Sequence, residues 1–151
     1  MKNIKRIFAL ALVLVMALTV TACHKKDEIA VKIGDVEFTS AYYMCALINA
    51  NSEAKMRVQE ELSESESKDD VDYYSKKIDD KDFVTWVEDT AVDSLKEIAA
   101  YKTLCKDNDL EISGEDVANA EAYASYYWSS YGYSLYFEPN GVGQSTYTHY
   151  M

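Results

Sequence analysis

The sequence predicts a mainly α-helical domain that opens with a short β-hairpin and continues with three to four helices. A single proline and five glycines in 151 residues argue against an all-β sandwich, which needs many turns. Between residues 83 and 107, apolar side chains recur at the spacing of one helix face. Alternating apolar and polar residues on both sides of Gly34-Asp35 predict the hairpin.

The first residues have the layout of a secretory signal. A basic tip at residues 2–6 precedes an apolar run over residues 7–20, which are the n-region and h-region of such a signal. The run is shorter than the about 20 residues of a permanent membrane span. It ends in Val-Thr-Ala-Cys at residues 20–23, which resembles the lipobox of bacterial lipoproteins.

The lipobox resemblance implies three segments. Residues 1–22 are a signal peptide that is removed, residues 23–28 are a lipidated tether, and residues 29–151 form the domain. The thiol of Cys23 carries the lipid and anchors the chain at the extracytoplasmic face of a bacterial cell membrane. Two or more acyl chains give stable anchoring. The alternative is a secreted protein in which Cys23 has no special role.

The net charge excludes one class of partner and disfavours another. It is −11 for the whole chain, and removal of the leader with its three basic residues lowers it by 3, to −14. Such acidity excludes the electrostatic footprint of a nucleic-acid binder and disfavours contact with anionic lipid. After Cys23 only Cys45 and Cys105 remain, too few for a disulfide framework and without zinc-site spacing. They are either small core residues or one bridge.

The predicted hairpin, over residues 30–38, must pack on another element because an isolated hairpin is marginal in water. Thr39 or Ser40 can cap the first helix, which we expect from about residue 41 to 60. Its apolar positions at helical spacing are Tyr43, Leu47, Ile48, Met56, Val58 and Leu62. Residues 60–82 are polar and acidic, and we expect a flexible, solvated segment there.

The second helix is predicted over residues 83–107. Its apolar face consists of Val84, Val87, Ala91, Leu95, Ile98 and Cys105, with Leu104 beside it. One of the aspartates at residues 79, 80 and 82 can cap its start. Asn108 can end it in the left-handed conformation.

The third helix is predicted to begin after Ser113, with Asp116 completing a short version of the capping box. It carries Val117, Ala120, Ala124 and Tyr127 at helical spacing and should stop near Gly132.

Near the end of the chain, Asn140-Gly141 predicts a turn. Ser145 or Thr146 can cap a further helix that begins at Tyr147. Because the sequence ends at Met151, we expect an N-terminal portion of a longer protein or a truncated relative of one.

Four segments, in order, resemble SurA-type and PrsA-type foldases. Residues 31–39 (VKIGDVEFT) look like the V-x-V-N-G-x-x-I-T opening, and residues 93–101 resemble the L-I-x-x-x-L-L helix. Residues 105–116 are similar to A-K-K-x-G-I-x-V-S-D-E-E, and residues 140–147 to x-G-I/V-S-x-E-x-F/Y. The sequence departs from the pattern of this family in two places: it has a Gly-Asp turn where the family has Asn-Gly, and no segment of it resembles the parvulin domain that many members carry.

This resemblance implies the N-terminal chaperone-like domain of a lipid-anchored foldase. PrsA-type foldases are themselves lipoproteins. The family's peptidyl-prolyl isomerase activity belongs to the parvulin domain, so no residue here inherits it.

The sequence contains no recognisable catalytic constellation. Its only histidines are His24 in the tether and His149 near the end, and neither has a Cys or Ser nucleophile nearby in sequence. Carboxylates occur in runs, which are usually solvated faces, and they lack the order of a calcium-binding EF-hand loop. We therefore expect no catalytic residue, no metal and no cofactor.

Aromatic residues are the unusual feature of the C-terminal part. Eight fall within fifteen positions: Tyr123, Tyr126, Tyr127, Trp128, Tyr131, Tyr133, Tyr136 and Phe137. One helix face cannot bury them all, and a grouped exposed set marks an interaction site. We expect Tyr126, Trp128, Tyr131 and Tyr133 to contact client proteins. Alternatively, the aromatic residues complete a core with a missing C-terminal part.

The leading hypothesis is a chaperone-like module that binds unfolded or nascent secreted proteins. Its partners are these clients and the membrane that holds its anchor, with no nucleic acid. One alternative is the remnant or N-terminal part of a peptidyl-prolyl isomerase foldase. Another is a surface lipoprotein that binds cell-wall glycans through its tyrosines.

Overall fold

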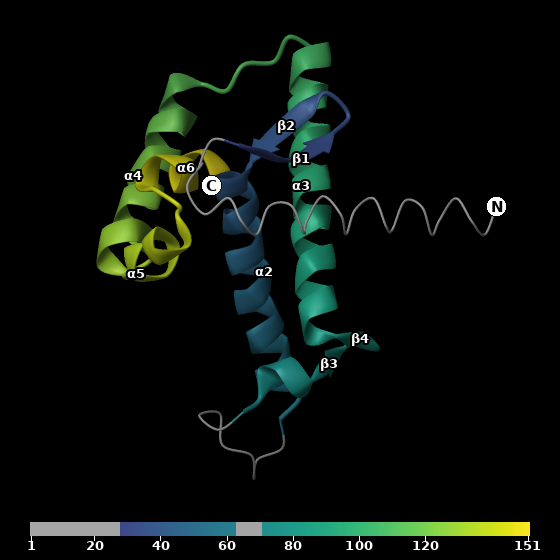
Figure 1. Cartoon of the computed structure of the whole chain (residues 1–151). Coiled ribbons are helices and arrows are strands. Elements are labelled where there is room, and N and C mark those ends of the chain that lie inside the picture. Colours follow the sequence, from purple (N-terminus) through teal and green to yellow (C-terminus); the bar gives the residue numbers. More distant parts are fainter. Residues whose placement is uncertain (1–27, 63–70) are drawn as a thin grey trace, which may run out of the picture.

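The computed structural model describes residues 28–62 and 71–151. These residues form a mainly helical structure with an N-terminal hairpin, as predicted (Figure 1). The predicted signal peptide, Cys23 and the predicted tether up to residue 27 lie outside the described residues. Within the described residues, no helix combines the length and the apolar character needed to cross a membrane.

The N-terminal hairpin consists of β1 (Ile29–Ile33) and β2 (Val36–Thr39), paired antiparallel with Ile33 opposite Val36. Gly34 occupies the turn with a φ of 59°, a left-handed conformation that glycine adopts without strain. Phe38 of β2 is 1% exposed and belongs to the main hydrophobic core. The hairpin is therefore packed on the helices, as its marginal intrinsic stability requires.

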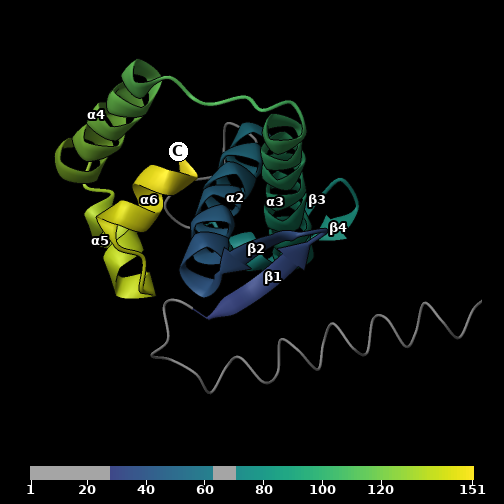
Figure 2. The same ribbon diagram turned by 90° about the horizontal axis from the view of Figure 1, so that it is seen from above.

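Two long antiparallel helices form the centre of the molecule. They are α2 (Ser40–Glu60) and α3 (Phe83–Asp107), and they lie side by side in both views (Figures 1 and 2). The oxygen of the Thr39 side chain accepts a hydrogen bond from the backbone N–H of Tyr42, 3.2 Å away, which confirms the predicted cap. Both predicted helices have the expected bounds.

The interface between α2 and α3 is built from small residues. On α2 the fully buried positions recur every four residues at Ala46, Ala50 and Ala54, while Ala91 and Leu95 face them from α3. Small side chains allow two helix backbones to approach closely. The core also takes in Phe83, Trp86 and Val87. It does not extend to the last turns of α3, where Leu104 is exposed.

A second hairpin precedes α3 within the segment that we expected to be solvated loop. It pairs β3 (Lys77–Ile78) with β4 (Lys81–Asp82) and follows a 3-10 turn, η2 (Tyr73–Ser75). Asp79 and Asp80 make the turn with φ values of 50° and 63°. Ile78 is buried in the main core, so residues 71–82 contain regular structure, contrary to the prediction. Residues 63–70 lie outside the described residues.

The left-handed residue that follows α3 lies one position later than predicted. Asn108 has a φ of −112°, and the left-handed residue is Asp109, with a φ of 50°. The backbone N–H of Leu110 donates to the carbonyl oxygen of Cys105 at 2.9 Å. This is the long hydrogen bond of a Schellman ending. Asp82 occupies the N-cap of α3, but its side chain makes no capping hydrogen bond.

The C-terminal part consists of α4 (Gly114–Ser130), α5 (Ser134–Phe137), the 3-10 turn η3 (Glu138–Asn140) and α6 (Gln144–Tyr150). Ser113 caps α4, its side-chain oxygen accepting from the backbone N–H of Asp116 at 3.1 Å. Gly141 makes the predicted turn with a φ of 78°. The last helix begins at Gln144 rather than at Tyr147, with Gly143 at its N-cap.

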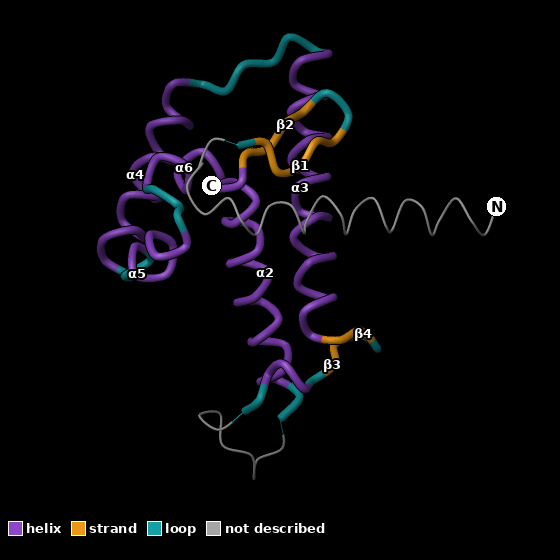
Figure 3. The backbone as a smooth tube through the Cα atoms, viewed as in Figure 1, coloured by secondary structure: helices purple, strands orange, loops and turns teal. Residues whose placement is uncertain are grey.

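Helix α6 connects the C-terminal part to the two long helices. The tube in Figure 3 shows it between α4 and α2. The hydroxyl of Tyr42 on α2 donates to the carbonyl oxygen of His149 at 3.2 Å. The hydroxyls of Tyr150 and Ser94 lie 3.4 Å apart and join α6 to α3. The C-terminal part is thus held on one side of the helix pair, with a hydrophobic cluster of its own.

Candidate binding surface

A buried aromatic base lies between α4, α5 and α6. Trp128, Phe137 and Tyr147 are each at most 7% exposed. The ring centroid of Tyr147 lies 5.7 Å from that of Trp128 and 5.0 Å from that of Phe137. Ring pairs at these separations add stability beyond their buried area. Cys45 of α2 and Val142 complete this cluster.

Four tyrosines continue this packing outward to the surface. We call Tyr126, Tyr127, Tyr131 and Tyr133 the tyrosine cluster. Tyr133 lies 5.7 Å from the buried Tyr147 and 5.6 Å from Tyr127. Tyr127 in turn lies 5.2 Å from Tyr131, and Tyr126 lies 5.5 Å from Tyr131. Each ring is therefore supported by another, from the core to the solvent.

The four residues that the sequence suggested as client contacts differ in their exposure to solvent. Tyr126 and Tyr131 are 53% and 60% exposed, so both are accessible as expected. Tyr133 is half-buried and supports its neighbours. Trp128 is only 7% exposed and belongs to the core, so the expectation that it contacts clients directly is wrong.

The orientation of α4 explains this division. Ala124 and Trp128 are its buried residues, four positions apart and hence on one face of the helix. The sequence grouped Val117, Ala124 and Tyr127 by helical spacing, but in the structure Val117 is exposed and Tyr127 is half-buried. Sequence reasoning therefore missed Tyr127 as a member of the surface. The spacing between Ala124 and the bulky Trp128 was the signal that could have found the correct face.

The buried tyrosine hydroxyls stay uncharged over a wide pH range. The pKa of Tyr147 is raised from 10.0 to about 12, mainly by burial and in smaller part by the neighbouring Tyr133 and Tyr127. Within the described residues, no buried polar side-chain atom lacks a hydrogen-bond partner. The ring of Tyr147, which lies beneath the tyrosine cluster, is thus neutral and held in place by packing.

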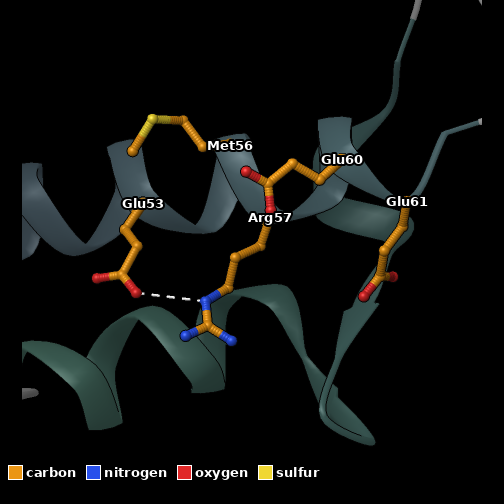
Figure 4. A pocket seen from close by; sticks show the side chains of 5 residues that line it. All are labelled: Glu53, Met56, Arg57, Glu60 and Glu61. Atoms are coloured by element: carbon orange, nitrogen blue, oxygen red, sulfur yellow. Dashed lines mark hydrogen bonds and ion pairs between the residues drawn. The ribbon is translucent and has the colours of Figure 1, made fainter.

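A shallow hollow of about 340 Å³ lies elsewhere, at the C-terminal end of α2. Its lining comes from Glu53, Met56, Arg57, Glu60 and Glu61, and Figure 4 shows Arg57 turned toward Glu53. The Arg57 Nε atom lies 3.3 Å from a Glu53 oxygen. Its guanidinium also lies 5.1 Å from the Trp86 ring centroid and 3.6 Å from Asp79. The Arg57 guanidinium is already engaged by its own chain, so it is not free to bind an anionic ligand in the hollow.

Candidate groups for covalent or metal chemistry do not come together in the described part of the chain. There, no group of three or more His, Cys, Asp or Glu residues could hold a metal ion. His149 is exposed, and its Nδ1 lies 2.8 Å from the carbonyl oxygen of Ser145. Cys45 and Cys105 are free thiols. Burial raises the pKa of Cys45 from 9.0 to about 12, which keeps its thiol protonated. His24 lies outside the described residues.

No protein-family model, curated protein or solved structure matches this chain.

Proposed function

We propose that this protein is a lipid-anchored, extracytoplasmic chaperone-like module that binds unfolded secreted proteins through its tyrosine cluster. The observation that carries the proposal is the pair of exposed rings, Tyr126 and Tyr131, supported from beneath by a buried aromatic base. A grouped set of exposed aromatic side chains is typical of an interaction site rather than of a plain solvent face.

Tyrosine suits the binding of varied, extended chains. Its ring gives a large contact area at the cost of ordering only two side-chain torsions. In this protein much of that ordering already exists, because Tyr127 packs against both exposed rings and against Tyr133, and Tyr133 packs against the base. A preorganised surface loses less conformational entropy on binding. The proposed action is passive: short-lived contacts hold apolar client segments apart without nucleotide or metal.

The proposed location rests on the sequence around Cys23. A lipid on this thiol would keep the module beside the membrane where secreted chains emerge. Mass spectrometry of the protein from a bacterial host checks this: we expect a chain that starts at residue 23 with added acyl mass. An unmodified chain that keeps residues 1–22 would contradict the anchor.

An aggregation assay tests the function. The full-length protein is added to a reduced, unfolded model client, and light scattering is followed with time. We expect wild type to delay aggregation at about equimolar ratio, and the double variant Tyr126→Ser/Tyr131→Ser to lose most of this effect. Tyr101→Ser is the matched control, since Tyr101 is 68% exposed on α3 and lies outside the tyrosine cluster. No delay by wild type, or equal delay by both variants, would contradict the proposal.

A further inference from the structure

The part of the chain that carries the tyrosine cluster is rich in carboxylates and lacks lysine and arginine. Residues 107–151 contain no lysine and no arginine. Their seven carboxylates are Asp107, Asp109, Glu111, Glu115, Asp116, Glu121 and Glu138. The ion pairs among the described residues all involve other parts of the chain. These seven charges therefore have no cationic partner within the described protein.

Elsewhere in the described residues, cationic side chains lie over aromatic rings. Four contacts place a lysine or arginine over a ring face, at 5.1 to 5.6 Å from the centroid. The pairs are Lys55 with Tyr73, Arg57 with Trp86, and Lys102 with both Phe38 and Tyr42. None of the described cations lies over a ring of the tyrosine cluster. Its exposed faces are thus electron-rich, supported and open to a cation from another molecule.

Carboxylates and rings share one side of α4. Asp116 precedes Tyr123 by seven residues and Glu115 precedes Tyr126 by eleven, which is close to two and three full helical turns. Tyr123 is also exposed. The separations along the axis are about 10 and 16 Å, similar to or somewhat above the screening length of about 8–10 Å at physiological salt. Within that length, and over more of the face at low salt, these carboxylates would attract an approaching cation to the side of α4 that carries the rings.

We propose that the tyrosine cluster selects client segments in which arginine or lysine alternates with apolar residues. This inference rests on the proposed function and names the substrate class of the same surface. The guanidinium or ammonium group lies over the exposed rings of Tyr126 and Tyr131, and the flanking apolar side chains pack against their edges. The carboxylates of α4 raise the rate of encounter, as complementary charges do in other complexes.

Two peptides of equal shape test the selection. Both are twelve residues long, with leucine at every second position and serine at three of the positions between. The other three positions hold arginine in one peptide and its uncharged analogue citrulline in the other. Fluorescence anisotropy with the full-length protein measures both affinities. We expect the arginine peptide to bind about tenfold more tightly at low salt, since each exposed cation–π contact contributes modestly. The ratio should fall as salt rises.

Two variants locate the effect. Tyr126→Leu/Tyr131→Leu keeps apolar surface but removes the ring faces, so the ratio of the affinities for the arginine and citrulline peptides should fall toward one. The control variant Tyr101→Leu should keep the wild-type ratio. Glu115→Gln/Asp116→Asn, which neutralises the two carboxylates on the side of α4 that carries the rings, should slow association of the arginine peptide and weaken its salt dependence. Equal affinity of wild type for the two peptides would overturn the charge selection and leave the proposed function standing. Failure to bind either peptide would overturn both.

Discussion

Replacing Trp128 with alanine should loosen the C-terminal part of the molecule without loosening the helix pair. Trp128 is 7% exposed and packs against Phe137 at 6.1 Å and Tyr147 at 5.7 Å between ring centroids. Truncating a buried tryptophan to alanine costs about 3–5 kcal/mol, a large share of the about 5–15 kcal/mol that stabilises a typical domain. The C-terminal cluster is separate from the main core, so we expect the loss to be local.

Native-state hydrogen exchange measures this loss by segment. A cost of 3–5 kcal/mol accelerates exchange of the protected α4 amides by about 10² to 10⁴, while amides near Leu95 in α3 should keep their rates. Trp86→Ala is the matched control, because Trp86 is also 7% exposed but lies in the main core, and it should accelerate the α3 amides. Equal acceleration of α4 and α3 in Trp128→Ala, or less than tenfold in α4, would refute this reasoning.

Three further substitutions have defined outcomes. Ala91→Leu overfills the fully buried α2–α3 interface and should lower the free energy of unfolding in urea by about 1–3 kcal/mol; no loss would mean that the helices are less closely packed than described. Gly141→Ala forces a side chain into a φ of 78° with nothing within 4 Å of the added Cβ, so strain alone should cost about 1–2 kcal/mol. The same change at Gly143, which has a negative φ and equal space, should be near neutral, and equal costs would contradict the assignment. Burial raises the pKa of Cys45 from an ordinary 9.0 to about 12 in the folded protein. The stability that this residue contributes to the folded state is therefore fully present below about pH 9 and is lost as the pH rises toward 12. In alkaline titrations followed by circular dichroism, Cys45→Ala should lose stability only from about pH 10 upward, because the raised pKa of Tyr147 makes unfolding more favourable above its ordinary pKa of 10.0. An onset of unfolding at the same pH as in wild type would exclude Cys45 as the cause.

The elements that the sequence predicted well are those with local signals. Gly34 marks the first hairpin because its turn requires a positive φ. Helix α3 repeats apolar residues over many turns, so its bounds agree with the prediction. Ser113 and Asp116 form a capping pair that depends on four consecutive residues alone. None of these features requires knowledge of a distant contact.

The elements that the sequence did not predict depend on distant contacts or on unusual turns. The second hairpin has strands of two residues and a turn made by Asp79 and Asp80 without glycine; Ile78 holds it through burial in the main core. Helix α5 is a single turn, too short to show a periodic pattern. Its Phe137 is buried only because Trp128 and Tyr147 meet it.

The candidate surface was predicted as a region but not residue by residue. Composition alone showed that some tyrosines must stay accessible, and Tyr126 and Tyr131 do. It could not show which side of α4 meets α6, since both faces carry aromatic rings. Packing of Trp128 on Tyr147 decides that orientation. The same packing makes Tyr127, which was not among the predicted client contacts, a support for the exposed rings.

Site-specific photo-cross-linking tests the central claim, that unfolded chains bind at the tyrosine cluster, most directly. A benzophenone amino acid is placed at position 126 in one sample and at position 101 in another, and each protein is irradiated with a reduced, unfolded client. We expect covalent adducts from position 126, and few from position 101, although both side chains are exposed. Adducts of equal yield from the two positions, or from position 101 alone, would contradict the account.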